Sequence, residues 1–318
     1  MNTKCIILAT FGSIYGEAVE KSVGTMERKI REAYPDTLVR RVFLADALIE
    51  KWNEKYETPV YSLEEVLLDC QKAGISDVFV LPFALVSDQC YQKLRKTVVQ
   101  FTQNVGPSRT GNQSGSKAMP RVYVGKPLLS SLGVKNYADD YEAAIDAILK
   151  HVNIRALNKS ILLMANGQNQ LEYSALQLKC MYGNGQNVAV FTSNGFPNFK
   201  QALTLLERLD HKEVLVVPLA LIGSEHLMDF LGGDRPDSVA TLLANEGYGV
   251  TIWSEGLGEN PYIQDVFLKH LSQSIRSIER KRQASPVAVK STTNGVVTTS
   301  ATSATKTNSS VLSRAHIC

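Results

Sequence analysis

DVFVLPFALV at residues 77–86 and EVLVVPLALI at residues 213–222 are two copies of one pattern in this chain of 318 residues. In each copy an acidic residue precedes Val-x-Val-x-Pro-x-Ala-Leu. Such a continuous apolar run is typical of a strand that is buried on both faces. Any buried strand can read in this way, but here the proline and the Ala-Leu pair recur in register. We therefore interpret the two stretches as an internal repeat that divides the chain into matched halves.

Short apolar runs alternate with longer segments of helical periodicity on both sides of each copy. We expect strands at residues 5–9, 38–44, 78–81, 121–124, 161–165, 188–191, 214–217 and 250–253. We expect helices at residues 17–34, 91–101, 137–152, 171–181, 199–209 and 263–278. Ser62 and Glu65 have the spacing of a capping box, which predicts a further helix start. This alternation predicts an α/β fold with parallel sheets covered on both faces.

The chain is expected to consist of two α/β halves, residues 1–135 and 136–282, followed by a tail. The tail, residues 283–318, is rich in Ser and Thr and lacks helical or strand periodicity, which predicts disorder. Residues 102–120 are polar and rich in Gly, Ser and Asn, which predicts an exposed loop within the first half.

The formal net charge of +3 comes from the predicted tail, which contains three basic residues and no acidic one. Without them, the remaining 31 Lys and Arg residues balance the 31 Asp and Glu residues. A neutral body gives no support for a nucleic-acid partner, since such binding depends on clustered basic charge. It also means that a polyanionic ligand has to find basic residues locally.

Cysteine usage and hydropathy indicate a cytoplasmic protein. The five cysteines are far apart in the sequence and include no Cys-x-x-Cys pair, which argues against a disulfide framework and a thiolate zinc site. No apolar run approaches the length of a membrane span, and residues 5–10 are too short for the core of a signal peptide. The sequence leaves the oligomeric state open, so a homo-oligomer stays compatible with it.

Several enzyme classes lack their sequence motifs here. There is no G-x-x-x-x-G-K-[ST] phosphate loop and no G-x-G-x-x-G dinucleotide turn. Neither a Gly-x-Ser-x-Gly elbow nor a His-Glu-x-x-His helix occurs. The search for a site therefore depends on the loops that follow the strands.

Ligands of open α/β sheets bind beyond the carboxyl ends of the strands, which selects residues 11–16, 84–91, 125–129, 165–173 and 223–229. The last of these loops, GSEHLMD, holds the best titratable cluster: Glu225, His226 and Asp229. If Ser224 caps a helix, Glu225 and Asp229 share one face of it. The alternative interpretation is that Glu225 and His226 are ordinary polar residues of a surface loop.

Five sequence segments resemble the anaerobic-type sirohydrochlorin cobaltochelatases, which are class II tetrapyrrole chelatases. They are TFGSIY at 10–15, AYPDTLVRRVFLA at 33–45, GKPLL at 125–129, YSALQ at 173–177 and GLGENPYIQDVFLKHL at 256–271. The resemblance extends from about residue 4 to residue 275. It implies two similar α/β domains, each with a parallel four-stranded sheet flanked by helices, and a tetrapyrrole between them. It also implies insertion of Co(II) into sirohydrochlorin in cobalamin biosynthesis.

The chain departs from the family pattern where the family carries its histidines and a glutamate. A Gly-His-Gly turn after the first strand of the second half is replaced by Ala165-Asn166-Gly167. The second family histidine corresponds to Glu225, with His226 beside it. In the first half, a histidine is replaced by Ala84, and a Gly-Glu-Glu-Tyr run by residues 88–91. Amides accept no proton near neutral pH, so the chemistry would have to be altered.

The resemblance assigns expected roles at the site. The expected catalytic residues are Glu225 as base, Asp88 as a partial substitute for the lost carboxylate, and Asn166 at the position of the missing histidine. His226 and Glu225 are the expected ligands of the substrate metal, Co(II) or another divalent ion. The residues expected to bind the tetrapyrrole are Phe11, Tyr15, Tyr91 and Lys126, and the basic candidates for its carboxylates also include Arg40 and Arg41.

Two hypotheses of different class stay open at this point. The first is an active metal chelatase, a lyase, with altered chemistry; the family resemblance favours it. The second is a non-catalytic tetrapyrrole- or haem-binding protein on a chelatase scaffold; the substituted residues favour it. The sequence identifies neither the metal nor the tetrapyrrole.

Overall fold

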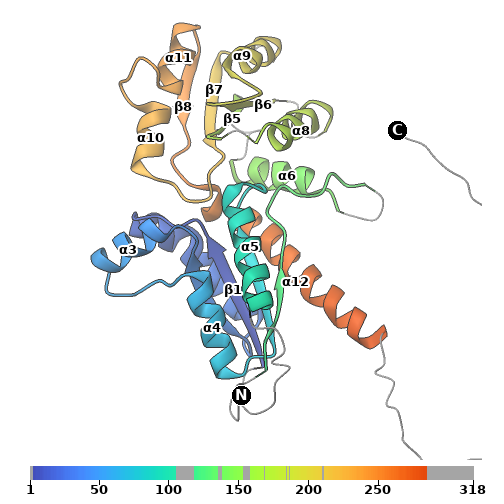
Figure 1. Cartoon of the computed structure of the whole chain (residues 1–318). Helices are drawn as coiled ribbons and strands as arrows, with labels where there is room; N and C mark the ends of the chain where they lie inside the picture. Colours follow the sequence, from blue (N-terminus) through green and yellow to red (C-terminus); the bar gives the residue numbers. More distant parts are fainter. Residues whose placement is uncertain are drawn as a thin grey trace, which may run out of the picture.

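Two four-stranded parallel sheets form the body of the protein in the computed structural model (Figure 1). The structure describes residues 3–104, 118–134, 138–152, 158–167, 169–183, 185, 187–209 and 211–284, except for the side chains of Asn104, His226 and Ala284. Residues 285–318 of the predicted tail and residues 105–117 of the predicted loop lie outside this range, whereas residues 283–284, also assigned to the tail, belong to the last helix. The domain boundary near residue 135 also falls beside residues that are not described, and it stays a prediction.

The first half begins with a strand and alternates strands with helices. Its elements are β1 Lys4–Thr10, α1 Gly16–Val19, η1 Glu20–Gly24, α2 Thr25–Ala33, β2 Leu38–Phe43, α3 Asp46–Lys55, α4 Leu63–Ala73, β3 Asp77–Phe83, α5 Gln89–Asn104 and β4 Arg121–Val124. The strand order is β2-β1-β3-β4. The capping box before α4 is confirmed, since Ser62 Oγ accepts from the amide of Glu65 and Glu65 Oε2 accepts from the amide of Ser62.

The second half repeats this arrangement. Its elements are α6 Asp140–Val152, β5 Ser160–Ala165, α8 Gln170–Tyr182, β6 Val188–Thr192, α9 Phe199–Arg208, β7 Glu213–Pro218, α10 Glu225–Gly232, α11 Val239–Asn245, β8 Gly249–Ile252, η2 Leu257–Glu259 and α12 Pro261–Ala284. The strand order is β6-β5-β7-β8. The two copies of the repeat form β3 and β7, which hold equivalent places in the two sheets. The predicted α/β fold class is thus confirmed.

Some helices differ from the prediction. The helix expected over residues 17–34 contains a five-residue π-helical turn, η1, between α1 and α2. A π turn bonds residues five apart, which apolar periodicity does not indicate. Helix α5 continues three residues into the predicted loop, to Asn104, and Thr102 Oγ1 donates to the carbonyls of Val98 and Val99 within it. Helices α3 and α11 were not expected from the sequence.

The last helix, α12, packs back on the first half. It contacts β3 of the first sheet as well as α6, and Figure 1 shows it running along the first half. Its apolar residues Phe267, Leu271 and Ile275 join one core cluster with residues of both sheets. This packing makes the two cores continuous, so it also fixes how the two halves face each other.

A buried carboxylate anchors the far end of α12 to the first sheet. Asp77, at the start of β3, has only 4% of its side chain exposed. Arg121 Nε donates to its Oδ1 at 2.9 Å, and Arg282 from α12 donates to both oxygens. Burial acts to raise the pKa of Asp77, but the hydrogen bonds from Arg282 and Arg121 outweigh it and lower that pKa to about 2.

This depressed pKa predicts a loss of stability in acid. The contribution of the Asp77 carboxylate to the free energy of unfolding is fully present above its ordinary pKa of 3.8. It disappears as the pH falls toward 2. We expect about 2 kcal/mol of the free energy of unfolding to be lost over that window. Urea denaturation of wild type and Asp77→Asn between pH 6 and pH 2 measures it. If the free energy of unfolding of the variant falls in parallel with that of the wild type between pH 4 and pH 2, Asp77 is not the source of the loss.

Candidate active site

The two halves meet where η1 of the first half packs against η2 of the second. Gly258 in η2 has no room for a side chain, since a Cβ atom there would collide with the carbonyl oxygen of Leu221 and lie 2.8 Å from Cβ of Ser22. A Cβ atom on Gly256 would lie 2.6 Å from the amide nitrogen of Gly223. These approaches fix the loop after β7, and therefore the start of α10, against the segment after β8.

Gly258→Ala is expected to destabilise this junction by about 1–3 kcal/mol, because backbone atoms of the β7 loop would have to move. Chemical denaturation compares the variant with Gly195→Ala, where the nearest atom to an added Cβ is Thr192 Oγ1 at 3.3 Å. Equal unfolding midpoints for the two variants would show that the junction accommodates a methyl group.

A pocket of about 710 Å³ lies at the junction, with walls from both halves. It is lined by Tyr15, Gly16, Glu17, Ala18, Lys21, Lys55, Tyr56, Gly223, Ser224, Glu225, Met228, Ser254, Glu255 and Glu259. We call it the junction pocket. Two lysines and two tyrosines come from the first half, whereas three of the four carboxylates come from the second.

Glu225 lies in the first turn of α10, as the capping hypothesis predicts. Ser224 Oγ accepts from the amide of Leu227 at 3.1 Å and so begins the helix. Glu225 is exposed, lines the junction pocket and makes no hydrogen bond or ion pair with any other residue that the structure describes. Its carboxylate is therefore available to a ligand. The side chain of His226, the expected metal ligand, lies outside the described part of the structure.

Asn166 does not line the junction pocket. It lies beyond the end of β5, where its Oδ1 accepts from Ser193 Oγ at 2.9 Å. It lines a second hollow, of about 890 Å³, at the carboxyl edge of the second sheet. Ser224 lines both hollows, so the start of α10 separates them. The structure brings Asn166 and Glu225 to neighbouring hollows rather than to one.

Asp88 and Tyr91 lie at the start of α5. Asp88 Oδ1 accepts from the amide of Tyr91 at 2.9 Å, and the Tyr91 hydroxyl donates to the carbonyl of Gly125. Burial, followed by the negative charges of Asp88 and Glu172, raises the pKa of Tyr173 to about 12. Asp88 thus lies near α8 of the second half, but it does not line the junction pocket with Glu225.

Lys126 forms part of a buried charged cluster with Asp140 and His270. Its Nζ lies 2.6 Å from Oδ2 of Asp140, whose side chain is only 3% exposed, and His270 Nε2 lies 3.0 Å from Oδ1. Burial acts to raise the pKa of Asp140, but hydrogen bonds from His270 and Lys126 outweigh it and lower that pKa. The lysine is therefore neutralised within the protein and joins β4, α6 and α12.

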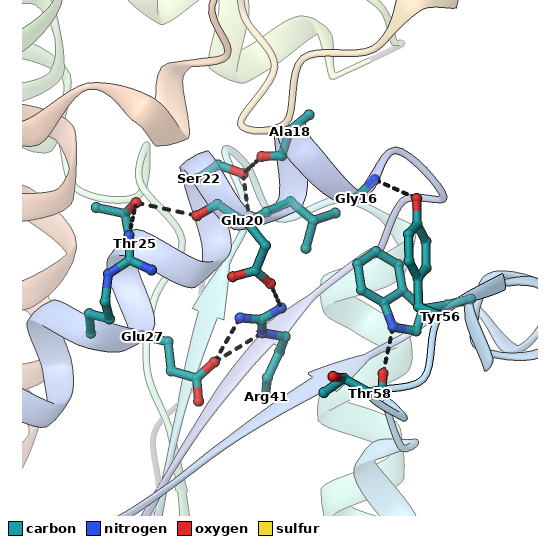
Figure 2. A network of polar contacts seen from close by, with 12 residues as sticks. Gly16, Ala18, Glu20, Ser22, Thr25, Glu27, Arg41, Tyr56 and Thr58 are labelled. Atoms are coloured by element: carbon teal, nitrogen blue, oxygen red, sulfur yellow. Dashed lines mark hydrogen bonds and ion pairs between the residues drawn. The ribbon is translucent and has the colours of Figure 1, made fainter.

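Arg41 is likewise paired within the protein. Figure 2 shows its guanidinium between two carboxylates of the helical segment from η1 to α2. The Nη1–Oε1 distance to Glu20 is 2.6 Å, and the Nη2–Oε2 distance to Glu27 is 2.9 Å. Arg40 and Arg41 line a groove along β2 and α2, outside the junction pocket. The structure thus places the expected arginines outside the pocket that holds Glu225, in a groove that shares Gly16, Glu17, Lys55 and Tyr56 with it.

The two aromatic residues of the first loop differ in position. Tyr15 lines the junction pocket, whereas Phe11 lies directly after β1 with 54% of its surface exposed.

Sequence reasoning missed several residues of the junction pocket, among them Lys21, Lys55 and Tyr56. Figure 2 shows Tyr56 against Gly16, whose amide donates to the tyrosine hydroxyl at 2.9 Å. Lys55 and Tyr56 lie at the end of helix α3, which was not expected, so no sequence pattern predicted their position in the junction pocket. Lys21 pairs with Glu17 at 2.6 Å, and four-residue spacing could have indicated that pair.

Neither a metal centre nor a membrane span is found in the described part of the chain. Among its His, Cys, Asp and Glu side chains, no group of three or more could hold a metal ion. None of its helices combines the length and apolar character needed to cross a bilayer.

The two sheets and the pocket between them define a chelatase-like α/β protein. SirB from Bacillus subtilis, solved with Fe3+, has the same fold, with a TM-score of 0.57, 15% identity, and coverage of 88% of this chain and 98% of SirB. A multi-domain Deinococcus radiodurans protein described as similar to chelatases gives a TM-score of 0.52 at 15% identity. That match covers 86% of this chain and 56% of the other.

Sequence comparison identifies the family. Residues 4–276 match the cobalt chelatase (CbiK) family, and the chain belongs to it. The sirohydrochlorin cobaltochelatase of Salmonella typhimurium is 23% identical over 278 residues, which cover 86% of this chain and 96% of that protein. The family resemblance expected from the sequence is thus confirmed.

Proposed function

We propose that the protein is an active chelatase that inserts Co(II) into sirohydrochlorin or a similar polycarboxylate tetrapyrrole in the junction pocket. The observation that carries this proposal is the carboxylate of Glu225, which has no partner among the described residues and lies in a pocket shared by both halves. Membership of the cobalt chelatase family supports the metal, and the Salmonella typhimurium relative supports the tetrapyrrole. We further propose that the reaction takes place in the cytoplasm and serves cobalamin biosynthesis.

The chemistry of the pocket suits this reaction. Insertion requires two pyrrole N–H protons to leave, and an ionised carboxylate accepts a proton at neutral pH. Carboxylate and imidazole groups also bind divalent cobalt, which assigns Glu225 and its neighbour His226 to the metal. Lys55, which lines the pocket from the first half, can pair with a substrate carboxylate, whereas Lys21 is paired with Glu17 and the half-buried Lys126 with Asp140.

A second candidate function is tetrapyrrole binding without catalysis. Asn166 favours it, because its amide cannot accept a proton and it lines a different hollow from Glu225. Of the residues expected to bind the tetrapyrrole, Tyr15 lines the junction pocket and would contact the macrocycle in either case, whereas Phe11 and Tyr91 do not line it. The proposals differ only in whether the metal enters faster with the protein than without it.

One assay separates the two functions. The full-length protein is mixed with sirohydrochlorin and Co(II), and in parallel with Fe(II) or Ni(II), while the absorption spectrum of the macrocycle is followed. A rate that exceeds the uncatalysed rate and saturates with both substrates supports the chelatase. A spectral shift on binding without acceleration would establish the non-catalytic function instead, and an unchanged spectrum would exclude both.

A further inference from the structure

We infer that Glu255 is a second proton acceptor of the junction pocket and that His151 is its positioning residue. This inference rests on the proposed chelatase function and adds a residue pair to the same site. It starts from a contact between residues 104 positions apart, in which His151 Nε2 lies 3.0 Å from Glu255 Oε2.

The backbone around Glu255 is held on both sides. The amide of Trp253 donates to the carbonyl of Val216 at 2.8 Å, which continues the pairing of β8 with β7. On the other side, the amide of Leu257 donates to the carbonyl of Ala220 at 2.7 Å. Glu255 therefore lies between two fixed points, on the segment that touches the loop before Glu225. Both carboxylates line the junction pocket.

His151 approaches Glu255 from the last turn of α6. Its ring packs edge-on against Trp253, with ring centroids 5.4 Å apart, and only 23% of its side chain is exposed. Asn260 Nδ2 donates to the carbonyl of Ala147 at 3.0 Å and so ties α6 to the segment that carries Glu255. The imidazole holds one oxygen of the carboxylate, while the glutamate side chain keeps 46% of its surface exposed.

Other charged groups of the pocket are already engaged. Glu259 Oε1 accepts from the amide of Gly256, and Glu17 pairs with Lys21. The hydrogen bond to Glu17, and further the negative charges of Glu259 and Glu255, raise the pKa of Lys21 above its ordinary value. Lys55 Nζ donates to the carbonyl of Ile14 at 3.3 Å, and Lys150, which does not line the pocket, stacks on the ring of Tyr262. Glu225 and Glu255 are thus the two carboxylates of this pocket that are neither capping a helix nor paired with a lysine.

The stoichiometry of metal insertion matches two acceptors. Two N–H bonds of the macrocycle break, and the electron pairs stay on the nitrogens, which bind the divalent metal. One proton passes to the Glu225 carboxylate and the other to the Glu255 carboxylate, and both then leave to water. No electron transfer is required. A hydrogen bond from His151 keeps the Glu255 carboxylate directed for this step.

The test compares kinetics of full-length variants with sirohydrochlorin and Co(II). Glu255→Gln should lower kcat about 10- to 100-fold while the KM for the tetrapyrrole stays within about two-fold. His151→Leu should lower kcat about 3- to 10-fold, and His151→Gln, which can still donate a hydrogen bond, should restore most of it. Glu246→Gln, an exposed carboxylate after α11, is the matched control and should keep wild-type kinetics.

Each outcome separates the inference from the function on which it rests. If the wild type accelerates insertion but Glu255→Gln keeps its kcat, the inference is wrong and the chelatase function stands. If His151→Gln and His151→Leu reduce kcat equally, His151 does not act through a hydrogen bond. If the wild type gives no acceleration, the proposed function fails and the inference fails with it. Thermal unfolding of each variant identifies loss of kcat that comes from misfolding.

Discussion

Glu225→Gln is expected to lower kcat for Co(II) insertion by about 100-fold or more, the effect of losing a general base. The amide has nearly the shape of the carboxylate but accepts no proton and binds a divalent metal weakly. Because Glu225 makes no hydrogen bond or ion pair with another described residue, the substitution leaves no orphaned partner. Stopped-flow absorbance with saturating tetrapyrrole measures kcat, and a titration of Co(II) measures any change in its apparent affinity.

Asp229→Asn is the matched control for this substitution. Asp229 lies one turn further along α10, outside the junction pocket, and its Oδ2 is 3.9 Å from Arg235 Nη1. The control removes the same charge from the same helix, but from a position outside the pocket. It should therefore keep kcat within about two-fold. Equal activities of the Glu225→Gln and Asp229→Asn variants would remove Glu225 from the mechanism.

Asp140→Asn should lower the free energy of unfolding by about 3 kcal/mol, which is the cost of removing one partner from a buried charged cluster. The carboxylate accepts from Lys126, His270 and the amide of Ser131. Its loss leaves the lysine without its counterion and the buried histidine without its hydrogen-bond partner. Because the cluster joins α6, α12 and the loop after β4, both halves should lose stability together. Urea denaturation followed by far-ultraviolet circular dichroism measures the change.

Asp265→Asn supplies the control, because it removes a surface ion pair with Lys29 that joins α12 to α2. The Asp265 side chain is largely exposed, so this loss should stay below about 1 kcal/mol. Adding Lys126→Met to Asp140→Asn should recover part of the loss, since the double variant contains no unpaired lysine at this site. Additive losses in the double variant would show that Lys126 and Asp140 are not coupled.

The strands were predictable because their physics is local. A strand buried on both faces needs a continuous apolar run, and the strands β1, β3, β5, β6 and β7 each contain one. The start of α10 was predictable for the same reason, since Ser224 caps the helix three residues before Leu227. Helix α3 was not predicted, and among its ten residues only Trp52 is buried, which leaves little apolar periodicity to detect.

The position of Glu225 was predictable, but the other residues that line its pocket were not. The carboxyl-end rule selected its loop, and the structure places the carboxylate in a pocket between the halves. The same rule selected Asn166 and Asp88, which lie outside that pocket. Lys126 and Arg41 are basic residues in the expected region, yet Asp140, Glu20 and Glu27 already neutralise them. A sequence shows which charges exist but not which of them pair.

The sequence by itself determined the repeated α/β halves and the loops that can carry a site. Only the tertiary structure decided the partners: Arg282 meets Asp77 across 205 residues, and His151 meets Glu255 across 104. Both contacts depend on how the elements pack: α12 returns to the first sheet, and α6 lies against the segment after β8. The physical reason is that these interactions differ in the sequence separation over which they act. Strand burial and helix capping depend on neighbouring residues, whereas the ionic pairing of a side chain depends on the three-dimensional packing of the whole fold.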